Sequence, residues 1–434
     1  MKGQPTISVL ILESQREISG LLRGNFFIEG LGLISGQFSA KIESDRIIFS
    51  VEGKSKRCKD FSLRLKSSDR SSFTLYQVII GSCFHWEREK NLTYEGDLVL
   101  KIKNGLIQAI NEIPLEDYLK SVISSEVNPS SPLEFLKAHA IISRSWILSK
   151  IEKKAKTMPS NLSRQKLGEN EIIRWYDSEN HDTFDVCSND HCQRYYGLLE
   201  SGQKKAAEAV NQTYGLVITY QGEICNACYS KICGGITEDF DTAWYDIKIP
   251  YLKSNSDSYY PYLPITNENE ARKWILSSPE VYCNIKDENL LKNVLGEIDL
   301  ETKTPFRWRI EYSKKELEEI LRQKSDIDFG SLYEIIPLLR GPSGRIHRLK
   351  IIGSKKEIIV GKELEIRRWL SRSHLFSSAF IIEKDQDKFI FHGAGWGHGV
   401  GLCQIGAAHM AIQGFSMEAI LKHYYSGIDI KKIY

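Results

Sequence analysis

Five glycines fall on every second residue near the end of this chain, in the stretch FHGAGWGHGVGLCQIGA from Phe391 to Ala407. A regular strand with that spacing would have no side chains on one face, so it would lose packing and gain flexibility when unfolded. The pattern is therefore expected only where another segment or a ligand comes very close to the backbone. No register reads G-x-G-x-x-G and no G-K-[ST] follows, so the stretch is not a dinucleotide or phosphate loop. Trp396 and His398 lie among the glycines, which favours a functional site over a plain strand-to-helix connection.

The composition argues against two classes of function. The net charge is +2 and no long Lys/Arg run is present, so nucleic-acid binding is not expected. No apolar stretch approaches the length of a membrane span. The first residues, MKGQPTISVLILESQ, contain a short apolar run that is soon closed by Glu13, which predicts a first strand and not a signal peptide.

The 434 residues can form two or three structural units. Residues 7 to 111 are predicted to form successive short strands, among them Ile7–Leu12, Arg46–Val51, Phe73–Ile80 and Leu98–Ile102. After Pro114 the apolar residues follow a helical stripe that starts at Leu115. A capping box of Ser131 and Glu134 opens the next helix, Leu133 to about Ile151.

Further elements are predicted as a helix at Gln203–Gln212, a hairpin of Leu216–Tyr220 with Glu223–Ser230, and C-terminal helices at Leu402–Gln413 and Met417–Tyr425. Residues 265–385 have the character of a separate α+β region. We therefore expect an α+β fold in three parts. These are a β-rich N-terminal region (1–111), a core of helices packed on a mixed sheet (112–264 and 386–434), and an inserted, smaller α+β region (265–385).

Glu126 occupies the next position on the helical stripe that begins at Leu115. A carboxylate on an apolar face, near the negative end of a helix dipole, is pushed toward its protonated form. Such an acid can donate a proton near neutral pH. The alternative is a structural ion pair, most plausibly with Arg144, the other charge on a predicted buried helix.

Two groups of cysteines raise the question of a metal. His181, Cys187, His191 and Cys192 supply four soft or borderline ligands within twelve residues, as a closed, structural zinc site requires. The alternative is a polar loop with two free thiols. Cys225, Cys228 and Cys233 are also closely spaced, but the first two fall on opposite faces of a predicted strand, which argues against a shared metal. The chain has nine cysteines, including Cys58, Cys83, Cys283 and Cys403, and the odd number favours thiols over a disulfide framework.

Several segments together resemble the stage II sporulation protein D/amidase-enhancer (SpoIID/LytB) family. They are Tyr94-Glu95-Gly96, PLEDYLKSVISSEV, EFLKAHAIISRSW, DHCQRYYG, NACYSKICGGITE with PYLK, and HGAGWGHGVGLCQIGAAHMA ending in ILKHYYSGI. They follow the family order from about residue 94 to the C-terminus, whereas residues 265–340 match poorly. Cys228, Cys233 and Cys403 depart from the family pattern, which has small or hydroxyl residues at these places.

The resemblance implies a peptidoglycan lytic transglycosylase that cuts glycan strands, preferentially those stripped of stem peptides. It places the catalytic acid at Glu126 in the 112–264 and 386–434 core. The residues that it assigns to glycan binding are Arg144, Gln193, Tyr195, Tyr229, Trp396, His398 and Gln404, with Trp396 or Tyr195 as a ring face and Arg144 beside Glu126 or the glycan. It also implies structural zinc on His181, Cys187, His191 and Cys192, and a place in the cell envelope, outside the cytoplasmic membrane.

Two other functions stay open at this point. Some family members are enhancers of a cell-wall amidase, which requires binding of glycan or of the amidase but no turnover. A zinc hydrolase is the weaker alternative, because the four ligands at His181–Cys192 would already close the coordination shell.

Overall fold

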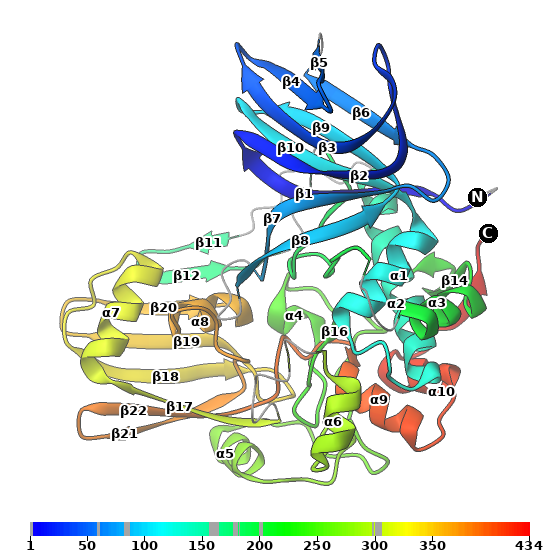
Figure 1. Cartoon of the computed structure of the whole chain (residues 1–434). Coiled ribbons are helices and arrows are strands. Elements are labelled where there is room, and N and C mark those ends of the chain that lie inside the picture. Colours follow the sequence, from blue (N-terminus) through cyan, green and yellow to red (C-terminus); the bar gives the residue numbers. More distant parts are fainter. Residues whose placement is uncertain are drawn as a thin grey trace.

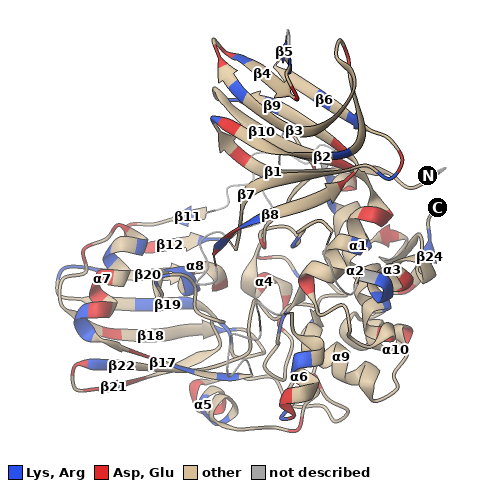
Figure 2. Ribbon diagram, in the orientation of Figure 1, with Lys and Arg blue, Asp and Glu red and all other residues tan. Residues whose placement is uncertain are grey.

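The computed structural model describes residues 3–58, 61–81, 87–155, 165–176, 181, 183–198, 203–296, 299 and 306–434, so Cys83 lies outside the described part. It confirms the α+β fold with a β-rich N-terminal part (Figure 1). No helix of the described residues has both the length and the apolar character needed to cross a bilayer. Basic and acidic residues are interspersed along the elements (Figure 2).

The N-terminal part is a large, mainly antiparallel sheet. Its strands are β1 (Thr6–Gln15), β2 (Glu17–Ile28), β3 (Gly32–Glu43), β4 (Arg46–Val51), β5 (Lys54–Arg57), β6 (Ser62–Ser67), β7 (Ser72–Ile80), β8 (Arg88–Glu95), β9 (Asp97–Lys103) and β10 (Leu106–Pro114). The four strands named from the sequence are confirmed as β1, β4, β7 and β9. In β4 the inward side chains alternate with outward ones, with Ile47, Phe49 and Val51 buried, as a strand packed on one face requires.

The helical part follows directly and packs under this sheet (Figure 1). Its helices are α1 (Leu115–Glu126), α2 (Leu133–Ala155), α3 (Gln203–Gln212), α4 (Phe240–Ala243), α9 (Gln404–Ile412) and α10 (Met417–Tyr424). Its short strands are β13 (Val186–Cys187), β14 (Leu216–Tyr220), β15 (Glu223–Ile224), β16 (Tyr229–Ser230), β23 (Leu402–Cys403) and β24 (Asp429–Lys432). The central helix α2 contacts α1, α3, α9, α10 and β14, which explains why it is apolar on most sides.

Two predicted elements in this part are wrong in extent. The hairpin ends after Ile224, because the chain then leaves the β14 sheet and Tyr229–Ser230 pairs in parallel with Leu402–Cys403 instead. For the same reason the helix predicted from Leu402 begins only at Gln404.

The third part has its own hydrophobic core, formed by side chains between Trp308 and Phe391. Its elements are α5 (Glu268–Leu276), β17 (Arg307–Ser313), α7 (Lys314–Ser325), β18 (Leu332–Arg340), β19 (Ile346–Gly353), β20 (Glu357–Gly361), α8 (Glu363–Trp369), β21 (Phe380–Asp385) and β22 (Lys388–Ala394). Helix α6 (Glu288–Val294) packs instead on the helical part, against α9. Two strands from earlier in the chain, β11 (Gln165–Leu167) and β12 (Glu171–Arg174), extend its sheet through β12 beside β20. The predicted boundaries at 111, 264 and 385 stay predictions, and this pairing shows that residues 165–174 join the sheet of the third part.

The alternating glycines do not form one strand. Only Gly393 lies in β22, and the four that follow have positive φ angles between 73° and 95°, which an L side chain rarely adopts. A Cβ at Gly399 would lie 2.5 Å from the Arg345 guanidinium, and one at Gly401 would lie 2.0 Å from the Cys228 carbonyl oxygen. The close approach predicted from the sequence is thus made by other parts of the protein, which hold Trp396 and His398 in place.

Candidate functional site

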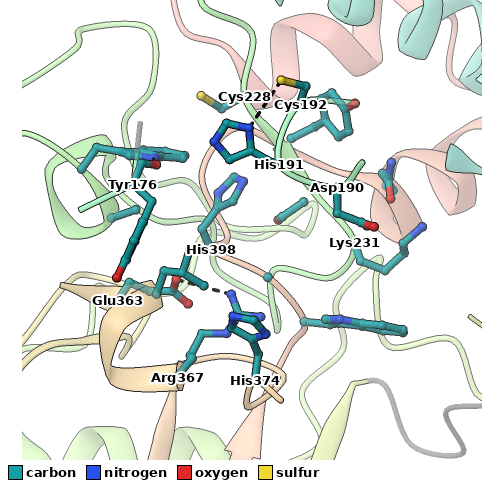
Figure 3. A pocket seen from close by; sticks show the side chains of 18 of the residues that line it. Tyr176, Asp190, His191, Cys192, Cys228, Lys231, Glu363, Arg367, His374 and His398 are labelled. Carbon is teal, nitrogen blue, oxygen red and sulfur yellow. Dashed lines mark hydrogen bonds and ion pairs between the residues drawn. The ribbon is translucent and has the colours of Figure 1, made fainter. Parts of the chain in front are cut away.

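A cavity of about 310 Å³ lies between the helical part and the third part of the chain (Figure 3). Five of the residues assigned to catalysis or glycan binding line it, namely Glu126, Tyr229, Trp396, His398 and Gln404. They come from the end of α1, from β16, from the glycine-rich segment and from the start of α9. His191 and Cys192 lie at one side of this pocket, and Glu363, Arg367 and His374 gather at another (Figure 3).

Glu126 is the last residue of α1, and its side chain is held at the pocket by two donors. Its Oε1 accepts hydrogen bonds from the Tyr229 hydroxyl at 3.0 Å and from the backbone N–H of Arg194 at 3.1 Å. Among the described residues, none donates to the other oxygen, Oε2. The residue is only 8% exposed. Glu126 therefore combines a fixed orientation with an oxygen available to a ligand.

The electrostatic surroundings favour the protonated form of Glu126. Burial raises the pKa of its carboxyl, while the nearby Arg194 and Lys231 lower it and Asp190 raises it further. The two cations are largely engaged elsewhere. Arg194 forms ion pairs with Asp190 at 2.6 Å and Asp299 at 3.1 Å, and Lys231 pairs with Asp299 at 2.7 Å. They therefore do not cancel the effect of burial.

Gln193 and Gln404 help to hold Tyr229 in place, the first directly and the second through His139. The Gln193 side-chain amide donates to the Tyr229 hydroxyl at 3.3 Å, and that hydroxyl in turn donates to Glu126. Gln404 hydrogen-bonds His139 at 2.8 Å, and the His139 ring packs edge-on against Tyr229 at a centroid distance of 4.8 Å. Gln193 is fully buried and is absent from the pocket lining, so the structure places it as a support for Tyr229 and not at a ligand.

His398 is a neutral imidazole with a defined tautomer. Its Nδ1 accepts the backbone N–H of Val400 at 3.0 Å, so its hydrogen resides on Nε2. Burial, together with Arg345 and Arg367, lowers its pKa to about 3, and it stays uncharged at neutral pH. Its ring also hydrogen-bonds the backbone of Tyr229, so His398 links the glycine-rich segment to β16 at the edge of the pocket.

Aromatic side chains form much of the remaining wall. Trp244 lies 4.8 Å from the His398 ring and stacks on Phe240 at 4.9 Å, while Trp396 packs edge-on against Phe376 at 5.6 Å. Trp244 and Phe376 were missed in the sequence, as were Tyr176, Lys231, Glu363, Arg367 and His374. No motif marks them, because most of them reach the pocket from the third part of the chain, where sequence patterns were least informative.

Arg144 is not part of this pocket, and its predicted contact with Glu126 is wrong. Its guanidinium forms a bidentate pair with Glu116, at 2.8 and 2.7 Å, and donates to the Leu216 carbonyl oxygen at 2.9 Å. Glu116 and Glu126 are ten residues apart on α1, so a helical stripe alone does not decide which of them meets α2. Arg144 thus forms a buried ion pair with Glu116 in place of the predicted contact with Glu126.

Tyr195 is also displaced from its predicted role as a ring face for the ligand. Its ring is only 1% exposed and is covered by Tyr94 and Tyr118, at centroid distances of 5.5 and 5.0 Å. Its hydroxyl donates to Asn111 at 2.5 Å. Tyr195 therefore links the N-terminal sheet to α1, and the exposed ring faces of the pocket come from other aromatic residues.

His181, Cys187, His191 and Cys192 converge as predicted, with their ligand atoms all within 4.8 Å of one another. Three nitrogen–sulfur separations are 3.4 Å (His181–Cys192), 3.8 Å (Cys187–His191) and 3.5 Å (Cys192–His191). Usual zinc bond lengths in a tetrahedron give a nitrogen–sulfur distance of about 3.6 Å. The residues present therefore fit a four-coordinate metal. Cys225 and Cys228 belong to neither of the ligand groups found among the described residues.

Comparisons with known proteins find similarity over most of the chain. Residues 103–220 match the model of the stage II sporulation protein family (SpoIID), and residues 238–401 match a domain of unknown function, DUF8618. An uncharacterized protein of Brachyspira hyodysenteriae is 26% identical over 78% of this chain and 72% of its own length.

Two Bacillus relatives carry functional names. The stage II sporulation protein D of Bacillus subtilis is 26% identical over 75% of this chain and 76% of its own length. The amidase enhancer of the same organism is 26% identical over 72% of this chain but only 40% of its own length. Residues 103–220 thus match the SpoIID family, and most of the chain is similar, at about 25% identity, to proteins named stage II sporulation protein D and amidase enhancer.

Proposed function

We propose that this protein is a peptidoglycan lytic transglycosylase that cleaves glycan strands and leaves 1,6-anhydromuramoyl ends. The observation that carries the proposal is Glu126, a buried acid with a raised pKa, one oxygen held by Tyr229 and Arg194, and the other oxygen without a described donor. The similarity to the SpoIID family supports the substrate class and a location outside the cytoplasmic membrane.

One carboxyl group is enough for this reaction. In the first step, Glu126 donates its proton to the bridging oxygen as the bond between that oxygen and C1 of the muramoyl residue breaks. In the second, the Glu126 carboxylate takes the proton of the 6-hydroxyl of the same sugar, whose oxygen bonds to C1. No water is consumed, whereas a hydrolase generally uses a second carboxylate to activate water or to attack C1. Asp190 also lines the pocket, where its Oδ1 is paired with Arg194 at 2.6 Å.

The rest of the pocket suits a polysaccharide. Trp244, Trp396 and Tyr176 supply ring faces that the apolar faces of sugars can cover. The decisive experiment is to incubate the protein with purified glycan, with and without stem peptides, and to analyse the fragments by mass spectrometry. Anhydro-ended fragments support the proposal, and fragments heavier by one water would show a hydrolase instead.

The amidase enhancer among the relatives makes a non-catalytic function the second candidate, with a cell-wall amidase as partner. The two functions differ in what Glu126 does. If Glu126→Gln binds glycan and stimulates an amidase as well as the natural protein, and neither releases anhydro ends, the enhancer function is correct.

The pH dependence of cleavage is expected to follow the protonation of Glu126. Because the first step needs the protonated acid, activity should fall as the pH rises through its raised pKa. The Tyr229 hydroxyl donates to the carboxylate, so Tyr229→Phe should raise the pKa further and move this loss of activity to higher pH. We also expect a roughly tenfold lower maximal rate, because the orienting hydrogen bond is gone. Cleavage rates measured from pH 4 to about pH 9 test this. If the activity of Tyr229→Phe falls at the same pH as that of the natural protein, the prediction is wrong.

We further propose that His181, Cys187, His191 and Cys192 bind a structural zinc ion. Its four protein ligands would leave no open position for substrate, so it would stabilise the loop that carries Arg194 and would not take part in the reaction. Cys187→Ser is expected to lose one zinc ion per chain and to unfold at a lower temperature. Elemental analysis and thermal unfolding measure both effects. Cys225→Ala, which removes a buried thiol outside the group, should keep its zinc, and equal zinc content in Cys187→Ser would refute the assignment.

A further inference from the structure

A second set of metal-ligating side chains lies outside the pocket, within the interior of the helical part. Cys233, Asp257, Cys283 and Cys403 come from four separate segments, and their ligand atoms all lie within 4.8 Å of one another. Their exposed fractions are 2%, 0%, 1% and 0%. No pattern in the sequence groups them, because 24, 26 and 120 residues separate successive members.

The sulfur atoms have the spacing and the hydrogen bonds of metal ligands. Cys233 Sγ lies 3.7 Å from Cys283 Sγ, close to the roughly 3.8 Å expected for two thiolates on one tetrahedral zinc ion and far longer than a disulfide bond. Backbone N–H groups point at two of the sulfurs. The N–H of Cys233 donates to Cys403 Sγ at 3.2 Å, and that of Gly235 donates to Cys233 Sγ at 3.4 Å. Such donors stabilise thiolates and orient them toward a metal.

The carboxylate of Asp257 is equally fixed. Its Oδ1 accepts the Tyr424 hydroxyl at 2.5 Å, and its Oδ2 accepts the backbone N–H of Cys283 at 2.8 Å. A Cβ at Gly406, in α9, would lie 2.3 Å from Oδ1 of Asp257. Glycine at position 406 therefore leaves the room that this carboxylate occupies. Each oxygen keeps a second lone pair, with which one of them can bind an ion.

A nearby cation has no carboxylate partner. The partly buried guanidinium of Arg307 donates only to carbonyl oxygens within the described chain, those of Gly234, Trp274, Ser277 and Phe306. Thiolates at Cys283 and Cys233 would interact favourably with it. Three thiolates and one carboxylate on a divalent cation have a net charge of −2, and Arg307 offsets part of that charge inside the protein.

We propose that Cys233, Asp257, Cys283 and Cys403 form a second, structural metal site, with zinc as the ion that this set of donors favours. The three thiols release their protons to solvent as the ion binds. Four protein ligands close the coordination shell, so the site has no place for substrate. Two residues of the pocket wall lie close to these ligands in the chain: Lys231 is two residues before Cys233, and Gln404 follows Cys403. The site therefore holds these two segments together and fixes one wall of the pocket. The inference does not depend on the proposed transglycosylase activity.

Counting metal ions on the folded chain tests this site. Native mass spectrometry of the full protein, expressed in zinc-supplemented medium, should find two zinc ions per chain. Cys187→Ser and Asp257→Asn should each retain one, and the double variant should retain none, whereas Cys225→Ala keeps two. A single ion in the natural protein that disappears in Cys187→Ser would overturn the proposal.

A second measurement covers the case in which Asp257→Asn fails to fold. Thiol alkylation of the natural protein, before and after unfolding in a chelator, is followed by peptide mapping. Cys233, Cys283 and Cys403 should be protected in the native state and all alkylated after chelation. A Cys233–Cys283 disulfide in the peptide map, or three reduced thiols in a folded chain that carries only one ion, would also overturn it.

Discussion

Replacing Glu126 by glutamine is expected to reduce the release of anhydro-ended fragments from denuded glycan by at least about 10³-fold. General acid–base catalysis contributes about 10²–10⁴-fold, and here one side chain serves both as acid and as base. Glutamine keeps the size of the side chain and can still accept the hydrogen bonds from Tyr229 and Arg194, but it can supply no proton. Fragment analysis by mass spectrometry, with a glycan-binding assay alongside, measures the effect.

The fold of this variant should be intact. Because burial raises the pKa of Glu126 in the folded protein, its contribution to stability is present below the unfolded pKa and is lost as the pH rises through the folded value. At pH 8, Glu126→Gln should therefore unfold at the same temperature as the natural protein or a higher one. Asp117→Asn is the matched control, since Asp117 lies on the same helix outside the pocket lining and, among the described residues, forms an ion pair only with Lys120, at 2.7 Å. It should cleave glycan at the natural rate, and wild-type activity in Glu126→Gln would exclude the mechanism.

The second large effect is on stability. Replacing Arg144 by methionine is expected to lower the free energy of unfolding by about 3–5 kcal/mol, because it leaves the buried Glu116 carboxylate without its cation. Both side chains are almost completely buried, so water cannot take the place of the lost partner. Denaturant unfolding followed by fluorescence gives the difference, and the same variant, kept well below its unfolding temperature, should bind glycan with unchanged affinity.

A double variant separates the ion pair from other effects of the mutation. Glu116→Gln with Arg144→Met removes both charges, and it should recover a large part of the lost stability while Tyr434 and Gly215 continue to donate to residue 116. If Arg144→Met is as stable as the natural protein but no longer binds glycan, Arg144 contacts the ligand and the structural role is wrong.

Local patterns were enough to predict much of the secondary structure and the position of Glu126. The stripe from Leu115 predicts a helix that reaches Glu126, and the structure has α1 at Leu115–Glu126. Helix α2 begins at Leu133 as predicted, but the side chains of Ser131 and Glu134 bond to Asn293 and Met417 and not to each other's backbone. The two helix starts were predicted correctly because helix periodicity depends on residues within a few positions of one another. The boundaries of the hairpin and of α9 failed because β16 and β23 pair across more than 170 residues.

The sequence by itself determined the α+β class and the resemblance to the SpoIID family, and it singled out Glu126 and the group of His181, Cys187, His191 and Cys192. The tertiary structure alone decided that Arg144 meets Glu116, that Tyr195 is covered, and that Arg345 and the Cys228 carbonyl fill the space beside the glycines. It also brought Cys233, Asp257, Cys283 and Cys403 together. The physical reason is the range of the contacts. The apolar stripe of a helix depends on residues close together in the sequence, whereas the partner of a buried charge or thiol depends on how distant segments pack.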